Sequence, residues 1–340
     1  MASKSRVIDA DGHITEGDDQ VKEFMESPYN KRQVGIYIGD NWDRSLYGTL
    51  GSRGSDAKTW LEAMDSGDME KAILYPTSGL AIGWIREADF AVATAKAYNN
   101  FFSEKFQKVS PRLNGVALLP LQDVEESVKE LRRAVTDLKL VGAMLPAVGL
   151  RKPLGHPDFW PIYEEAERLG TVLAVHATVR GPHYFAADLF DHFIDTHTLS
   201  HSFAQMMQMT NIIYRGILEK FPKLKIAFME AGCTWVPYWI GRMDEEWGLR
   251  GEIEAPLCKQ KPSEYVKSGR VFISVETDEE LLPQAAKVVG EDVLLYASDW
   301  PHWDHEYPDN IRYLESREDM SPELKQKVLS DNATRLYGDF

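Results

Sequence analysis

The sequence predicts an α/β protein folded as a distorted (β/α)8 TIM barrel, with long loops at the C-terminal face of the strands. Short, nearly continuous apolar segments rich in β-branched residues recur along the 340 residues, and amphipathic helical patterns separate them. No G-x-G-x-x-G follows the first apolar segment, which disfavours a dinucleotide-binding open sheet. We therefore expect the whole chain, 1–340, to form a single barrel.

The predicted strands share a length of four to six residues and a high apolar content. They are 7–10, 71–75, 114–119, 140–145, 171–175, 224–229, 271–275 and 293–297. Eight strand–helix units in one chain favour a closed barrel over an open doubly wound sheet.

Helical periodicity is found in the segments between these strands. The predicted helices are 56–65, 86–108, 123–138, 158–169, 203–218, 281–289, 308–316 and 322–337. Three connections after strands are long, namely 14–55, 177–202 and 231–269. They leave the face where barrel enzymes keep their active sites, so we expect 14–55 and 177–202 to be insertions that shape a substrate pocket.

Composition restricts the partners and the compartment. The formal net charge of -15 argues against nucleic acids and anionic membranes, and it leaves a small molecule as the expected partner. Only two cysteines, Cys233 and Cys258, are present, which favours a reducing cytoplasm. No apolar run approaches the roughly 20 residues of a membrane span, and none near the N-terminus has the length of a signal peptide. We also expect a homodimer or a higher homo-oligomer.

Acidic and histidine residues follow most of the strands whose C-terminal ends would meet at one mouth. They are Asp11, His13, His176, Glu230, Glu276 and Asp299. Taken singly, each has a structural explanation, as a helix cap or as a hydrogen-bonded core histidine. Together and unpaired they would resist burial, and a divalent cation removes that cost. Mixed histidine and carboxylate ligation favours Zn, with Mn or Fe as alternatives, over Ca or Mg.

Several stretches are similar to a known family. They include VIDADGH (7–13), HPDFWPIYEEAERLGTVLAVH (156–176), FPKLKIAFMEAG (221–232), YASDWPH (296–302) and KVLSDNATRLYG (327–338). The chain resembles the amidohydrolase superfamily over nearly its whole length. Within it, the chain resembles the branch of non-oxidative decarboxylases of aminocarboxymuconate semialdehyde, resorcylate and carboxyvanillate. The resemblance implies a metal held by Asp11, His13, His176 and Asp299.

The sequence departs from that family at two positions. Members typically have H-x-H or E-x-H on the first strand, where this chain has Asp11 and His13. The decarboxylases place a histidine after the sixth strand, where this chain has Glu230, and His201 just ahead of a predicted helix is an alternative source of that imidazole. The fourth strand offers no lysine for a carbamylated bridge, so one metal is the simpler expectation. Glu230, His201 and His302 nevertheless leave a second metal open.

These ligands are compatible with more than one reaction. The resemblance favours decarboxylation of a small, aromatic carboxylic acid. The alternatives are hydrolysis of an amide, imide or lactone-type bond by metal-activated water, and other chemistry, including oxidation, at a two-metal site. The candidate catalytic residues are Asp299, His201, Glu230 and His302. The candidate substrate-binding residues are Arg180, which suits a carboxylate, and Trp300 and Trp303, which either stack on a ring or form the pocket wall.

Overall fold

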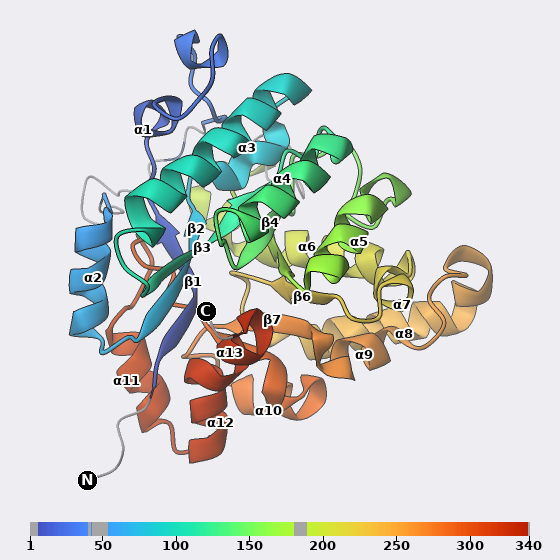
Figure 1. Cartoon of the computed structure of the whole chain (residues 1–340). Helices are drawn as coiled ribbons and strands as arrows, with labels where there is room; N and C mark the ends of the chain where they lie inside the picture. The colour runs from blue at the N-terminus through green and yellow to red at the C-terminus, as the bar shows by residue number, and fades with distance from the viewer. Residues whose placement is uncertain (1–5, 40–41, 43–53, 180–188, 339–340) are drawn as a thin grey trace.

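Eight parallel strands form a ring in the order β1 to β8, and helices surround it (Figure 1). The computed structural model describes residues 6–39, 42, 54–179 and 189–338. The strands are β1 (Ile8–Ile14), β2 (Lys71–Pro76), β3 (Leu113–Leu118), β4 (Gly142–Pro146), β5 (Val172–His176), β6 (Lys225–Phe228), β7 (Val271–Val275) and β8 (Leu294–Tyr296). The predicted (β/α)8 barrel is confirmed, and each predicted strand coincides with an observed one.

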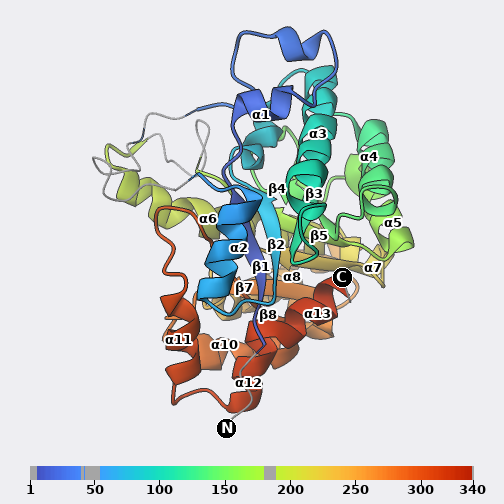
Figure 2. The same ribbon diagram turned by 60° about the vertical axis from the view of Figure 1, so that its left-hand side comes forward.

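Helices cover the outside of the ring, and Figure 2 shows α3, α4 and α5 in a row along it. The main helices are α1 (Asp18–Lys22), α2 (Ala57–Ser66), α3 (Ala88–Phe102), α4 (Val124–Thr136), α5 (Trp160–Leu169), α6 (Phe193–Tyr214), α7 (Ile217–Lys220), α8 (Trp235–Glu254), α9 (Pro262–Tyr265), α10 (Leu282–Val289), α11 (Asp309–Ser316), α12 (Pro322–Gln326) and α13 (Asn332–Tyr337). Among the described residues, no helix combines the length and the apolar character needed to cross a membrane.

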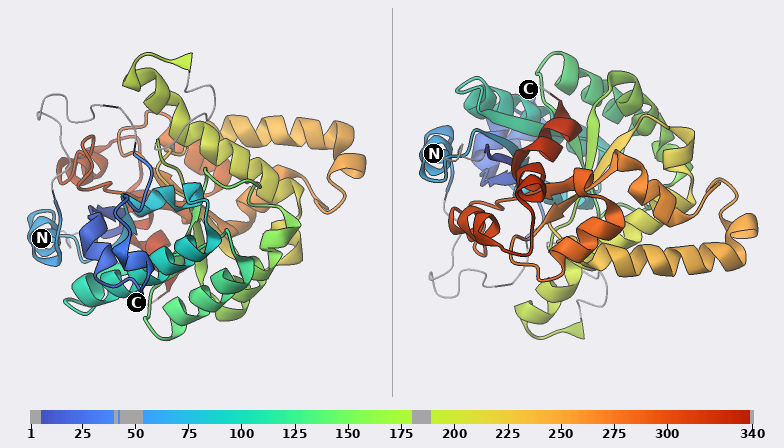
Figure 3. Two further views of the ribbon diagram at one scale, coloured as in Figure 1. Left: turned by 90° about the horizontal axis from the view of Figure 1, so that it is seen from above. Right: turned by 90° about the horizontal axis from the view of Figure 1, so that it is seen from below.

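Two helices differ from the sequence prediction. The segment 231–269, expected to be a long connection, contains α8, which projects away from the barrel (Figure 3). Helix α6 begins at Phe193, ten residues before the predicted start, inside the expected loop 177–202. In both helices the apolar residues are spread around the axis instead of forming one stripe, so helical periodicity is weak there.

The first strand is longer than expected. Backbone pairing with β2 continues through His13 and Ile14, after an irregularity between Asp9 and Gly12. Asp11 and His13 therefore lie within β1 instead of following it. They alternate with Gly12, so both side chains point to the inside of the ring.

Backbone bonds between β1 and the segment directly after β8 close the ring. The amide of Asp299 donates to the carbonyl of Asp11 at 3.0 Å, and the amide of His13 donates to the carbonyl of Trp300 at 2.7 Å. Behind this seam lies Trp60, which is fully buried and donates from Nε1 to the carbonyl of His13 at 2.9 Å. The Trp60 ring meets the Trp300 ring edge to face at 4.6 Å between centroids.

We predict that Gly12→Ala destabilises the protein. A Cβ at this position would lie 2.4 Å from the Trp60 ring and 2.8 Å from the Asp9 carboxylate, so the seam would have to shift. The expected loss is about 1–3 kcal/mol of unfolding free energy, measured by urea denaturation. The control is Gly241→Ala in α8, where nothing lies within 4 Å of the new Cβ. An equal effect of the two substitutions would contradict the packing described here.

Candidate metal centre

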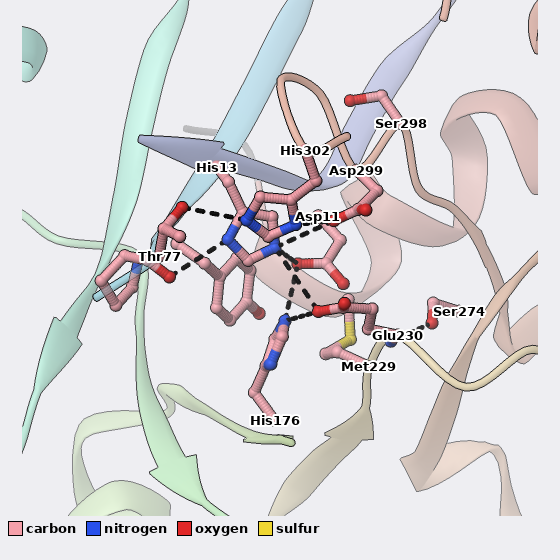
Figure 4. Close-up of polar contacts among 12 residues, drawn as sticks. Asp11, His13, Thr77, His176, Met229, Glu230, Ser274, Ser298, Asp299 and His302 are labelled. Carbon is pink, nitrogen blue, oxygen red and sulfur yellow. Dashed lines mark hydrogen bonds and ion pairs between the residues drawn. The ribbon is translucent and has the colours of Figure 1, made fainter. Parts of the chain in front are cut away.

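Histidines and carboxylates from separate strand ends converge at the C-terminal mouth of the barrel. Figure 4 shows their side chains facing one point. The contributing residues are Asp11 and His13 from β1, His176 from β5, Glu230 after β6, and Asp299 and His302 after β8. The expected convergence of these strand ends is thus present in the structure.

His13 is fully buried and held in one orientation. Its Nδ1 donates to the carbonyl of Pro76 at 3.1 Å, and because that carbonyl only accepts, the proton must lie on Nδ1. Its Nε2 therefore offers a lone pair to the centre, 3.3 Å from Asp299 Oδ1 and 3.5 Å from Asp11 Oδ1. Burial, with repulsion from His302 and His176, holds the pKa of His13 well below its usual value, so the ring is neutral.

His176 has the same arrangement. Its Nδ1 donates to the carbonyl of Ala177 at 2.8 Å, and its Nε2 lies 3.0 Å from Glu230 Oε2 and 3.5 Å from Asp11 Oδ1. Burial lowers the pKa of His176, but attraction to Asp11 and Glu230 outweighs it and raises the pKa to about 10. Without a cation, His176 thus holds a proton that the carboxylates stabilise.

Glu230 and Asp299 reach the centre from strained backbone. Their φ angles are 53° and 51°, in the left-handed region that non-glycine residues rarely occupy. Burial raises the pKa of Glu230, but His201 and His176 outweigh it and bring the pKa well below its usual value. Burial and repulsion from Glu230 raise the pKa of Asp299 well above its usual value. The same site therefore favours the charged form of Glu230 and the protonated form of Asp299.

Two further histidines flank the centre. His302 stacks on His13 at 4.0 Å between ring centroids, and its Nδ1 lies 2.7 Å from Asp299 Oδ1. Its Nε2 lies 3.0 Å from the Thr77 hydroxyl. His201 lies within α6 rather than ahead of a helix, and its Nε2 is 3.3 Å from Glu230 Oε1.

Several buried atoms at the centre have no hydrogen-bond partner within the described part of the chain. They are both carboxylate oxygens of Asp11, Nε2 of His13, Nε2 of His176 and Oε2 of Glu230. Buried polar atoms are normally satisfied, since an unpaired one costs about 1–3 kcal/mol. The ligand atoms of Asp11, His13 and His176 lie within 4.8 Å of one another, as do those of His13, Glu230, Asp299 and His302. This donor set fits a divalent cation.

Asp9 and Thr77 contact this centre, although neither was among the residues predicted from the sequence. Asp9 is fully buried and accepts from the amides of Asp11 and Ser298 at 3.1 and 2.9 Å and from the Ser298 hydroxyl at 2.5 Å. Burial raises its pKa to about 7. The alternation of aspartates at positions 9 and 11 on one strand is the signal that could have identified Asp9.

Two cavities open onto the centre and share His197, His201, Glu230 and Asp304. The aromatic lobe, of about 360 Å³, has Trp42, Phe193 and Trp303 among its lining residues, with Leu80 and Val179. The acidic lobe, of about 350 Å³, has Glu276, Asp278 and Glu306 in its wall. A larger cavity, of about 540 Å³ between α6 and the segment after β4, contains none of the converging residues.

The predicted substrate-binding residues have different positions. Trp303 lines the aromatic lobe. Trp300 is 7% exposed, packs against Trp60 and lines neither lobe. Arg180 lies outside the described residues.

A family model described as Amidohydrolase matches residues 8–338, and the chain therefore belongs to this family. Among curated relatives, it is 25% identical to 2-amino-3-carboxymuconate-6-semialdehyde decarboxylase from Dictyostelium discoideum, over 87% of this chain and 80% of that protein. It is also 25% identical to a gamma-resorcylate decarboxylase from Rhizobium sp., over 89% of this chain and 92% of the relative. The resemblance recognised in the sequence is confirmed.

Solved structures have the same fold. The 5-carboxyvanillate decarboxylase from Sphingomonas paucimobilis aligns with a TM-score of 0.78 at 21% identity, covering 98% of this chain and 99% of the other. A dihydroxybenzoic acid decarboxylase from Polaromonas sp., solved with manganese and the inhibitor 2-nitroresorcinol, aligns with a TM-score of 0.77 at 22% identity, covering 98% and 97%.

We predict that metal binding releases at least one proton. His176 with a pKa of about 10 must lose its proton before Nε2 can act as a ligand. Below that pKa, the apparent affinity for Zn²⁺ or Mn²⁺ should rise about tenfold per pH unit for each displaced proton. Calorimetry of the metal-free protein in buffers of different ionisation enthalpy measures the release. A metal affinity that does not change with pH below about 10 would contradict a protonated His176 in the metal-free protein.

Proposed function

We propose that this protein is a metal-dependent, non-oxidative decarboxylase of a small aromatic carboxylic acid. The observation that carries the proposal is the set of unpartnered histidine nitrogens and carboxylate oxygens that opens onto an aromatic cavity. The names of the relatives support it, because decarboxylases of resorcylate and of aminocarboxymuconate semialdehyde align over most of the chain.

One divalent cation is held by Asp11, His13, His176 and Asp299 in this proposal. The choice of one ion is supported by His13, since the two candidate ligand groups share it and its Nδ1 is already bonded to Pro76. The ligand types suit Zn²⁺ or Mn²⁺, and manganese is present in the solved Polaromonas relative. When bound, such a cation would polarise the carboxylate and phenolate oxygens of the substrate.

The reaction needs a proton at the ring carbon that carries the carboxylate. His302 and Asp299 share one across their 2.7 Å contact, and Thr77 fixes the other side of the His302 ring. Transfer of this proton to the carbon lets the C–C bond break, and its electron pair returns to the ring as CO2 leaves. His201 and Glu230 hold a second proton beside the cavity, from which the donor can be restored.

The aromatic lobe orients the substrate in this proposal. Trp303 offers a face for the ring, and Arg180 is proposed to bind a carboxylate by two hydrogen bonds. We further propose that 14–55 and 177–202 are the segments that shape the pocket of a single barrel, 1–340. Trp42 from the first segment, and Phe193 and Val179 from the second, support this because they line the lobe.

We also propose a cytoplasmic homo-oligomer. Both cysteines are free and buried, in agreement with a reducing compartment. Helix α8 exposes Leu249 and Ile253, 74% and 85% accessible, which suits contact with a second copy.

The metal content tests the first part of the proposal. We expect one equivalent of Zn or Mn per chain by elemental analysis, and its loss in His176→Ala, because Asp11, His13 and Asp299 cannot supply the missing fourth ligand. His156→Ala, which removes a half-exposed histidine away from the centre, is the matched control. Two equivalents per chain would replace this proposal by a two-metal site.

The reaction is tested by CO2 release from a panel of hydroxy- and aminobenzoates with the metal-loaded protein. We expect turnover of at least one acid, and a fall in kcat of about 10²–10⁴-fold in His302→Gln, with the metal retained. Cleavage of amides or lactones without any CO2 release would refute decarboxylation and favour the hydrolytic alternative.

A further inference from the structure

The acidic lobe is a second compartment of the active-site cavity. Thr77 lines the aromatic lobe and Ser298 the acidic lobe, and Figure 4 shows these residues on opposite sides of the converging ligands. Glu230, His201, His197 and Asp304 line both, so a molecule at the centre can extend into either.

The acidic lobe is lined by more carboxylates than basic side chains, and the basic ones are His197, His201 and His305. Its lining residues include Glu276, Asp278, Asp304 and Glu306 in addition to Glu230 and Asp299, and no lysine or arginine is among them within the described part of the chain. Glu276 and Glu306 form no ion pair among the described residues. Burial and repulsion from Glu279 raise the pKa of Glu276 to about 8, and a bound cation would favour its charged form. Carboxylates facing one cavity in this way repel an anion and attract a cation.

The wall also contains polar groups that lack a partner. Thr277 is 4% exposed and Asn310 is 7% exposed, and both line the lobe. The Asn310 side-chain oxygen accepts from Tyr296, but its amide nitrogen has no acceptor among the described residues. The Thr277 hydroxyl likewise has no partner there. Both side chains are otherwise packed into the wall and line the cavity, so each can hydrogen-bond to a polar group of a ligand in the lobe.

We propose that the acidic lobe binds a protonated amine substituent of the substrate. This rests on the proposed function, since the ring and its carboxylate would occupy the centre and the aromatic lobe. The ammonium donates to Glu276 and Glu306 and to the Thr277 hydroxyl, while the Asn310 amide donates to an oxygen beside it. The substrate class is therefore an aromatic acid with a basic amine side chain, and a second carboxylate at that position is disfavoured.

The experiment uses 2-hydroxybenzoates with an aminomethyl, an ethyl or a carboxymethyl substituent on the ring. Dissociation constants are measured by calorimetry with the metal-loaded full chain, and kcat/KM is measured in parallel. We expect the aminomethyl compound to bind about tenfold more tightly than the ethyl compound, and the carboxymethyl compound to bind most weakly. High salt should reduce the preference.

Variants that each neutralise one carboxylate test which residues produce the preference for the aminomethyl compound. Glu276→Gln and Glu306→Gln should each lower the aminomethyl-to-ethyl ratio by up to about fivefold, the factor that one partly exposed ion pair supplies. Glu315→Gln on the outside of α11 removes the same charge away from the lobe and should leave the ratio unchanged. Far-UV spectra and melting temperatures verify the folding of each variant.

Three results would overturn the inference. They are equal affinity for the aminomethyl and ethyl compounds, an unchanged ratio in both lobe variants, and a second equivalent of metal that Glu276→Gln removes. Failure of the proposed function is distinguishable from these. An amine preference in binding without any CO2 release would refute the proposed decarboxylation and support amine binding in the acidic lobe. CO2 release without an amine preference would support decarboxylation and refute amine binding in the lobe.

Discussion

The seam between β1 and β8 is the interaction on which the rest of the structure depends. It closes the ring through the backbone bonds of Asp11 with Asp299 and of His13 with Trp300. The same bonds bring residues nearly 290 positions apart in sequence to a common point. Asp9 reinforces the seam by accepting from Ser298, so barrel closure and ligand placement are one arrangement. Trp60 fills the space behind it and leaves no room for a side chain at residue 12.

The electrostatics of the centre follow from this closure. Carboxylates and imidazoles are forced close together at a largely buried point, where each charged form is penalised by desolvation. The groups respond by differing in protonation, with His13 neutral, His176 protonated and Asp299 raised in pKa beside a charged Glu230. A cation would take the place of the proton on His176. The left-handed backbone at Glu230 and Asp299 is strained, and it is found where both carboxylates turn toward the centre.

Much of the fold could be predicted from the sequence because the strands are short apolar segments and most helices have one apolar stripe. Helix α8 and the first ten residues of α6 could not, since their apolar residues surround the axis. The converging residues were predictable because strand ends of a parallel barrel meet at one face. Asp9 and Thr77 were not predicted, because their roles arise from contacts with Ser298 and His302 across more than 220 positions of sequence. The burial of Trp300 likewise depends on a ring partner, Trp60, that no local pattern indicates.

The two lobes are built from different loops of the barrel. The wall of the aromatic lobe comes largely from the segments after β1 and β5, whereas Glu276 and Asp278 follow β7 and Glu306 follows β8. Substitutions at 276–278 or 306 therefore alter one compartment while leaving Trp42 and Phe193 of the other in place. In this architecture separate sets of mutations can reshape the two compartments, while the residues of β1 and β5 that converge at the centre stay constant.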